Sequence, residues 1–204
     1  MLSEVSLEAV THGSFYESLM GLRKGAVIGI SGGDSIQPFL RYAIANLHLF
    51  EGSKFILTDE RCVSDEHTLS NYGQALSVFG NRLSVTSTKT VFEENWAFID
   101  FDLVIMGFGV DGHFASVFPD FDEALSDERD CSFKTMVPVG NPRCIRYSLS
   151  EEVISAALKI LLLVNSEAKS QTIDKCKVGQ LSKTPLSRLL ARRPDIHVIK
   201  LVNQ

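Results

Sequence analysis

The sequence predicts an α/β fold in which a doubly wound, mainly parallel sheet carries helices on both faces. Two observations predict it. Short apolar runs alternate with stretches of helical periodicity, which is typical of a parallel sheet. Most of these runs are apolar throughout, as expected for strands covered on both faces. The length of 204 residues suits one such unit, so we expect residues 1–204 to form a single domain.

The expected elements follow from these patterns. The continuous apolar runs predict strands at 26–31, 54–58, 102–106, 159–165 and 196–202. A sixth run, 143–149, alternates in polarity and is compatible with an edge strand. Helical spacing of apolar residues predicts helices at 15–24, 36–49, 70–83, 151–158, 167–175 and 185–192.

Composition excludes several classes of protein. Twenty Lys and Arg against 25 Asp and Glu give a formal charge of −5. A general nucleic-acid binder needs a basic surface, so we expect no nucleic-acid partner, although a local cationic pocket for a small phosphorylated ligand remains compatible with this charge. No apolar run approaches the roughly 18 residues of a membrane span. The first residues lack a signal-peptide pattern, and the four cysteines form no C-x-x-C. We therefore expect a cytoplasmic protein with reduced thiols and no membrane association.

Glycines and charged residues follow four of the expected strands. The four segments are 32–35 (GGDS), 59–61 (DER), 107–113 (GFGVDGH) and 166–169 (SEAK). Ligands of open α/β sheets bind at the carboxyl ends of the strands. We therefore expect one composite site built from four loops.

The first of these loops has three interpretations. Gly32 and Gly33 allow a tight turn whose N–H groups face an anion beside a helix N-terminus. They are equally compatible with a simple strand-to-helix turn capped by Asp34 or Ser35. Residues 29–33 also fit G-x-S-x-G, a nucleophile elbow with Ser31. An elbow normally follows several strands, whereas this is the first strand of the chain.

The loop at 107–113 contains the residue that points most clearly to catalysis. His113 follows a glycine-rich strand end, with Asp111 two residues before it. Imidazoles accept and release protons near neutral pH, so His113 is a candidate acid–base group; the alternative is a turn histidine bonded to backbone. Residues 107–112 also fit G-x-G-x-x-G, but Pro119 follows too soon for the helix of a dinucleotide site.

The remaining candidates are charged side chains and one thiol. Arg61 offers bidentate anion binding, and Asp59 and Glu60 beside it either orient it or bind substrate hydroxyls. A surface charge cluster is the alternative. Further candidate cations are Arg143, Arg146 and Lys169. Cys62 is more typical of a small buried hydrophobe than of a nucleophile, and the spacing of residues 65–67 (DEH) does not favour a metal site.

These segments together resemble the 6-phosphogluconolactonase family. Residues 107–120, GFGVDGHFASVFPD, resemble its motif G-x-G-x-D-G-H-x-A-S-L-F-P, and 58–72, TDERCVSDEHTLSNY, resemble its D-E-R…S-N-Y segment. Residues 31–38, SGGDSIQP, resemble its S-G-G-S-T-P loop. RYSL at 146–149 and SEAK at 166–169 lie where the family has R-I-T-L and G-x-x-K. The matches run in order over residues 27–198.

The resemblance implies a Rossmann-like fold similar to glucosamine-6-phosphate deaminases and ribose-5-phosphate isomerases. It implies hydrolysis of 6-phospho-D-glucono-1,5-lactone to 6-phospho-D-gluconate in the oxidative pentose phosphate pathway. The expected partner is a phosphorylated sugar lactone, with no metal and no organic cofactor. We expect a monomer or a small homo-oligomer.

The resemblance also implies roles for individual residues. His113 would act as the general base that activates water, and Asp111 would orient the loop or the imidazole. Asp59 would contact sugar hydroxyls or organise its loop. The phosphate would be bound by Gly32, Gly33, Arg61, Arg146 and Lys169.

Departures from the family pattern keep two alternatives open. Asp34 stands where the family has a serine, and an acid beside a phosphate loop repels the ligand. This favours a catalytically weak protein that binds sugar phosphates as a sensor. The other alternative is a sugar-phosphate isomerase similar to glucosamine-6-phosphate deaminases, which continue D-G-H into F-N-E-P, whereas this chain has residues 115–119, ASVFP.

Overall fold

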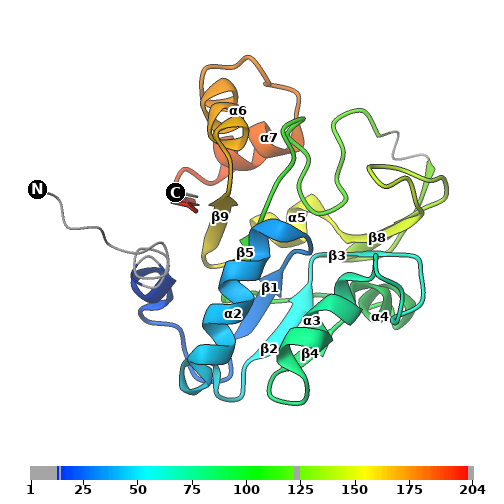
Figure 1. The fold of residues 1–204 in the computed structure, drawn as a ribbon. Coiled ribbons are helices and arrows are strands. Elements are labelled where there is room, and N and C mark those ends of the chain that lie inside the picture. The colour runs from blue at the N-terminus through cyan, green and yellow to red at the C-terminus, as the bar shows by residue number, and fades with distance from the viewer. Residues whose placement is uncertain (1–12, 14, 122–124, 202–204) are drawn as a thin grey trace, which may run out of the picture.

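The computed structural model describes residues 13, 15–121 and 125–201. Its larger sheet has six parallel strands in the order β10-β9-β5-β1-β2-β4 (Figure 1). They are β1 (Val27–Ile30), β2 (Lys54–Leu57), β4 (Ser84–Thr86), β5 (Leu103–Met106), β9 (Ile160–Val164) and β10 (His197–Lys200). The chain adds strands outward from β1 in one direction and outward from β5 in the other. The sheet is therefore doubly wound, as predicted, and its order reverses between β1 and β5.

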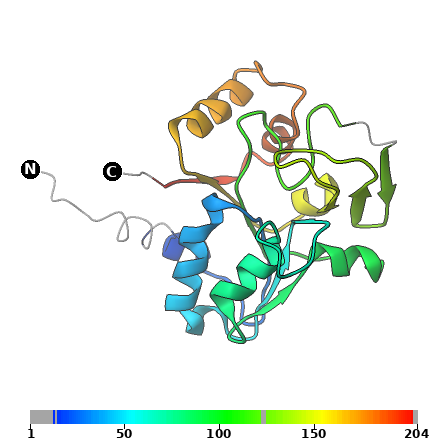
Figure 2. The ribbon, with the colours of Figure 1, turned by 45° about the vertical axis from the view of Figure 1, so that its right-hand side comes forward.

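Helices cover both faces of this sheet (Figures 1 and 2). The helices are α2 (Gln37–Ala45), α3 (Asn71–Phe79), α4 (Thr88–Glu93), α5 (Glu151–Ser155), α6 (Glu167–Lys177) and α7 (Pro185–Arg192). On β5, Leu103 and Ile105 belong to a hydrophobic cluster that includes Phe39 of α2. Val104 and Met106 belong to a second cluster with residues of α5, α6 and α7. Alternate residues of one strand therefore pack on opposite faces, which explains the continuous apolar runs.

A second, antiparallel sheet lies beside the first. Its order is β3-β8-β7-β6, with β3 (Asp59–Arg61), β6 (Ser126–Glu128), β7 (Ser132–Thr135) and β8 (Arg146–Leu149). The interpretation of residues 143–149 as an edge strand was wrong. Residues 146–149 form β8, which is buried and lies between β3 and β7. β3 follows β2 after Thr58 and supplies the edge on which β8 pairs. Strands β3, β4, β6 and β7 have no apolar run and were not predicted.

Several helices are shorter than predicted. The stretch 36–49 contains α2 flanked by 3-10 turns at Asp34–Ile36 and Leu47–Phe50. The helix expected at 70–83 ends at Phe79, because Gly80 has φ +55°. In the stretch 15–24 the helical residues are 15–19. No helix in the described part of the chain is long and apolar enough to cross a membrane.

Candidate active site

The candidate site is a cleft of about 280 Å³ at the carboxyl ends of β1 and β5, where the strand order reverses. Seven of the eight predicted site residues line it: Gly32, Gly33, Asp59, Arg61, His113, Arg146 and Lys169. The eighth, Asp111, contacts His113. The loops after β1, β2, β5 and β9 therefore meet in one place, as predicted.

The loop after β5 is held by backbone hydrogen bonds. Gly109 N donates to His113 O (2.8 Å) and Gly112 N donates to Gly109 O (3.0 Å). Gly112 has φ +82°, and its carbonyl accepts a hydrogen bond from Leu186 N at 2.9 Å. The loop is thereby fixed to the start of α7. These bonds set the position of the His113 side chain.

His113 and Asp111 form a close pair. His113 Nδ1 lies 2.6 Å from Asp111 Oδ1. The hydrogen bond from His113 lowers the pKa of Asp111, although burial acts in the opposite direction. An ionised carboxylate only accepts hydrogen bonds, so in this pair Nδ1 carries the hydrogen, and the Nε2 lone pair of a neutral imidazole is the one that can accept a proton. The ring of Phe118 lies 4.7 Å from the imidazole and packs against it.

Antiparallel pairing brings two arginines together. In the register of β3 and β8, Arg61 lies directly opposite Arg146. Like charges at such positions repel each other unless they are compensated. Arg61 Nη1 donates to Leu69 O (2.7 Å) and Asn71 Oδ1 (2.6 Å). Its Nε is buried and has no hydrogen-bond partner among the described residues.

Arg146 is compensated more completely. Its side chain is buried, its Nε donates to Val139 O (3.3 Å), and its Nη2 donates to Pro142 O (3.0 Å). Its Nη1 lies 3.7 Å from Asp59 Oδ2, which also accepts a hydrogen bond from Ser116 Oγ (2.8 Å). Arg146 is therefore a fixed, largely neutralised cation, whereas Arg61 retains an unused donor.

Lys169 reaches the cleft from the first turn of α6. Its Nζ donates to Ser35 Oγ at 2.6 Å and lies 5.7 Å from the centroid of the Phe108 ring. Burial lowers the pKa of Lys169, and the nearby carboxylate of Asp34 acts in the opposite direction. Asp34 itself lines the cleft. The acid that departs from the family pattern is therefore close enough to affect the charge of this lysine.

The glycine turn after β1 allows close packing. Gly33 has φ +83°, a conformation that other residues rarely adopt. A methyl group on Gly32 would overlap the side-chain amide of Asn71. Gly33 is followed by the 3-10 turn at Asp34–Ile36 and then by α2. The turn therefore leads into a helix N-terminus, and the absence of a side chain at Gly32 leaves room for Asn71.

Sequence reasoning missed four side chains that complete the site. They are Ser35, Asn71, Ser116 and Phe118. All four lie within the quoted motifs, but nothing in their spacing indicates what they contact. The contacts of Ser35 with Lys169 and of Ser116 with Asp59 join segments far apart in the sequence, whereas Asn71 and Phe118 contact residues of their own motif.

The competing interpretations gain no support from the geometry. Ser31 is buried, and its Oγ accepts a hydrogen bond from Gly107 N (3.0 Å) that ties the ends of β1 and β5 together, a structural role rather than that of an exposed nucleophile. A dinucleotide-binding motif requires a helix directly after its last glycine, and none begins after Gly112. Cys62 lies beside the Tyr147 hydroxyl (3.8 Å), and neither residue is among those lining the cleft.

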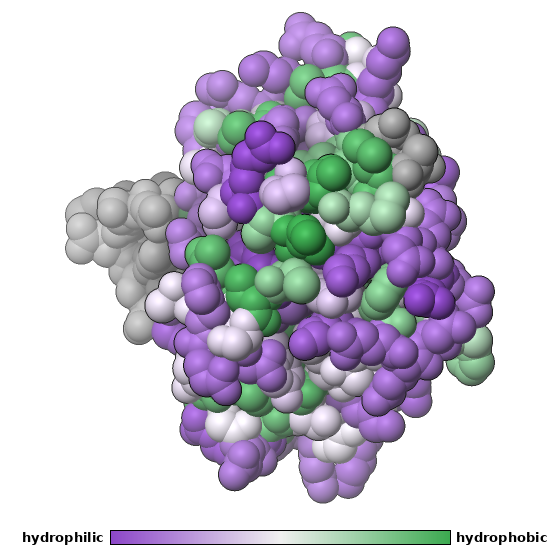
Figure 3. Space-filling view, turned by 90° about the vertical axis from the view of Figure 1, so that its right-hand side faces the viewer, coloured by the Kyte–Doolittle hydropathy of each residue, from purple (hydrophilic) through white to green (hydrophobic). Residues whose placement is uncertain are grey.

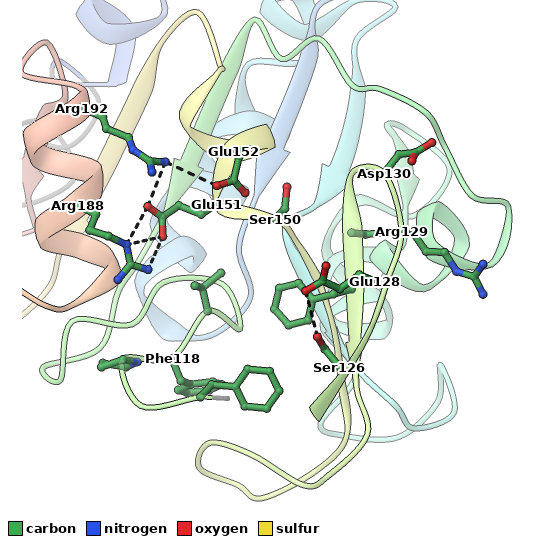
Figure 4. Close-up of a pocket in the computed structure, with 15 residues that line it drawn as sticks. Phe118, Ser126, Glu128, Arg129, Asp130, Ser150, Glu151, Glu152, Arg188 and Arg192 are labelled. Carbon is green, nitrogen blue, oxygen red and sulfur yellow. Dashed lines mark hydrogen bonds and ion pairs between the residues drawn. The ribbon is translucent and has the colours of Figure 1, made fainter. Parts of the chain in front are cut away.

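A second, larger cleft of about 530 Å³ (Figure 4) shares Phe118 with the candidate site. Its Arg188 and Arg192 converge on the buried carboxylate of Glu151, at 2.6 Å and 3.3 Å. The face of the molecule shown in Figure 3 carries hydrophobic side chains gathered near its middle. Because its arginines are ion-paired, this cleft is a poorer phosphate site than the smaller one.

The sequence is similar to those of known proteins. A family model described as glucosamine-6-phosphate isomerases/6-phosphogluconolactonase matches residues 88–198. The chain is 27% identical to a 6-phosphogluconolactonase from Borreliella burgdorferi over 91% of this chain and 87% of that protein. It is 26% identical to the Homo sapiens 6-phosphogluconolactonase over 85% of this chain and 76% of that protein.

Solved structures show the same fold. The crystal structure of 6-phosphogluconolactonase from Thermotoga maritima superposes with a TM-score of 0.72 at 22% identity, covering 95% of this chain and 93% of that one. The enzyme from Trypanosoma brucei superposes with a TM-score of 0.74 at 20% identity, covering 97% and 93%.

Proposed function

Because the chain belongs to the glucosamine-6-phosphate isomerase/6-phosphogluconolactonase family, we propose that it hydrolyses 6-phospho-D-glucono-1,5-lactone to 6-phospho-D-gluconate, in the oxidative pentose phosphate pathway. Relatives that are named 6-phosphogluconolactonase match most of the chain. The observation that carries the proposal is the His113–Asp111 pair at 2.6 Å, which opens onto the cleft that contains Arg61 and Lys169. A proton acceptor and phosphate-binding cations thus share one small cavity.

The proposed reaction begins with His113 as general base. Nε2 takes a proton from water while the water oxygen bonds to the lactone carbonyl carbon, and the carbonyl electrons move to the oxygen. Backbone N–H groups of the glycine-rich turns are suited to stabilise this oxyanion. Asp111 stabilises the imidazolium that forms. When the tetrahedral intermediate collapses, the ring C–O bond breaks and the imidazolium returns its proton to the departing alkoxide. The product acid then ionises in water.

The phosphate is proposed to bind at the opposite end of the cleft. Arg61 supports this assignment because its buried Nε has no partner among the described residues. Lys169 and the N–H groups of Gly32 and Gly33 supply further donors. Arg146 is proposed to contribute charge and shape rather than a free donor, with Asp59 placed between it and Ser116. Phosphate binding would make the attack of water effectively intramolecular.

A second candidate function is a sugar-phosphate sensor with weak catalysis. Asp34 favours it, because a carboxylate that lines the cleft weakens the binding of a dianion. The deaminase alternative has no comparable support, since residues 115–119 lack the family's glutamate.

We further propose that the two sheets work as one domain, because β2 leads into β3 through Thr58 and both sheets contribute to the cleft. A cytoplasmic location and a monomer or small homo-oligomer are part of the same proposal. The cysteines support the cytoplasmic location, because reduced thiols are typical of that compartment. The four free thiols are Cys62, Cys131, Cys144 and Cys176.

A coupled assay tests the proposed activity. Glucose-6-phosphate dehydrogenase generates the lactone, and its disappearance is followed with and without the protein. We expect acceleration that falls by about 10²-fold or more in His113→Ala and stays unchanged in His197→Ala, an exposed histidine of β10. Acceleration that survives in His113→Ala would refute the proposed base. An inactive wild-type protein that is protected against heat by 6-phosphogluconate would favour the sensor.

A further inference from the structure

Among the residues that the structure describes, the hydrogen-bond partners of the Arg61 guanidinium all lie on one nitrogen, Nη1. Nη1 donates to the carbonyl of Leu69 (2.7 Å) and to Oδ1 of Asn71 (2.6 Å), while the buried Nε has no partner among the described residues. In a guanidinium, Nε and Nη2 share one edge, and such an edge binds two oxygens of one phosphate in parallel. The hydrogen bonds that Nη1 donates therefore fix the guanidinium without occupying the Nε position of the Nε–Nη2 edge.

Asn71 is itself held from three sides. Its side-chain Nδ2 donates to Asp59 O (2.9 Å) and faces Asp59 Oδ1 (3.4 Å). Its backbone N donates to Glu60 Oε1 (2.9 Å), and Gly32 leaves just enough room for its amide. Since Arg61 only donates and the Asp59 oxygens only accept, the amide has one orientation that satisfies both.

Glu60 fixes the backbone from which both side chains extend. Its buried carboxylate accepts hydrogen bonds from Arg61 N (2.6 Å), Asn71 N (2.9 Å), Tyr72 N (2.6 Å) and Ser70 Oγ (3.1 Å). It therefore joins the end of β3 to the N-terminus of α3. Burial raises the pKa of Glu60, and the backbone hydrogen bonds oppose this shift. The junction that carries Arg61 and Asn71 is consequently rigid.

We propose that Asn71 is a positioning residue for phosphate recognition, which holds Arg61 by Nη1 and leaves the Nε of the guanidinium for the phosphate of the substrate. This inference rests on the proposed function only for the identity of the substrate. The same geometry predicts binding of inorganic phosphate, which separates the two.

A double-mutant cycle of Asn71→Ala, Arg61→Ala and their combination, with one control variant, tests the inference. In Asn71→Ala, Arg61 loses one of its two anchors, so we expect KM for the lactone and Kd for inorganic phosphate to rise by about tenfold, with kcat within about threefold of wild type. In the double variant with Arg61→Ala, removing Asn71 as well should add nothing further. Gln74→Ala is the control, because it removes a hydrogen bond between α3 and Thr68 O (2.9 Å) without touching Arg61. We expect its phosphate affinity to match wild type.

The results that would overturn the inference are distinct from failure of the proposed function. Phosphate affinity unchanged in Asn71→Ala, a loss confined to kcat, or additive effects in the double variant would each overturn it. Asn71→Asp serves if the alanine variant does not fold: it keeps the size and the acceptor but neutralises Arg61, so phosphate should bind at least tenfold more weakly. Unchanged binding there would also overturn the inference. If the wild type binds phosphate but hydrolyses no lactone, the binding comparisons still decide the role of Asn71; if it binds no phosphate, the inference is wrong.

Discussion

Replacing Gly109 by alanine should separate catalysis from stability. A methyl group at this position would overlap three atoms of the His113–Asp111 pair, namely Asp111 Oδ1 and the Nδ1 and Cε1 atoms of His113. Gly109 does not have a positive φ, so alanine is compatible with its backbone. The overlapping atoms belong to side chains that can turn away. The loop should therefore fold while the imidazole is displaced.

The expected loss follows from the size of that displacement. Ordinary van der Waals contact begins near 3.4 Å, and reaching it requires the imidazole and the carboxylate to retreat by roughly 1 Å. A misplacement of about 1 Å costs on the order of 10²-fold in rate, or about 2.7 kcal/mol in the barrier. Stability should change little, because Gly→Ala at a compatible position stabilises by about 0.4–1 kcal/mol through the unfolded chain.

The assay is lactone turnover beside a melting curve, with Gly179→Ala as the matched control. Gly179 has φ +78° and open space around its Cβ position, and it is not among the residues lining the cleft. Alanine there should cost about 1 kcal/mol of stability and leave kcat unchanged. Gly109→Ala should instead lower kcat about 10²-fold and change stability little. Undiminished kcat in Gly109→Ala would refute the assigned position of the His113–Asp111 pair.

Three further predictions concern the same cleft. Asp111→Asn should lower kcat at least tenfold. The hydrogen bond from His113 lowers the pKa of Asp111, so the ionised carboxylate stabilises the fold at pH values above its unfolded pKa near 3.8. In melting curves, the wild type should therefore lose its higher stability over Asp111→Asn as the pH falls through the lower pKa of the folded state. Asp34→Asn should lower KM several-fold at low ionic strength and less at high salt, because it removes a carboxylate beside Lys169, which we propose binds the phosphate. An unchanged KM would contradict this. Gly32→Ala should destabilise the fold by about 1–3 kcal/mol in urea titrations and weaken phosphate binding, because the methyl group overlaps the buried Asn71; wild-type stability would exclude that packing.

The central sheet was predictable because burial on both faces constrains every position of a strand. The runs at 102–106 and 159–165 are apolar except at their ends, and their apolar residues form β5 and β9 at the centre of the hydrophobic core. The meeting of the loops was predictable for a related reason, since the carboxyl ends of parallel strands lie at one edge. The antiparallel sheet was not: β3 and β6 are three polar residues each, and only their pairing with distant partners makes them strands.

By itself, the sequence determined the fold class, the carboxyl-end location of the site and seven of the residues that line it. Only the tertiary structure decided how these residues differ from one another. Pairing of β8 with β3 sets Arg146 opposite Arg61 and next to Asp59, so one arginine is neutralised while the other keeps a buried, unpaired donor. Packing of α3 against the glycine turn brings Asn71 to Arg61. Such differences depend on how strands and helices pair and pack in three dimensions, and local patterns of polarity carry no information about them.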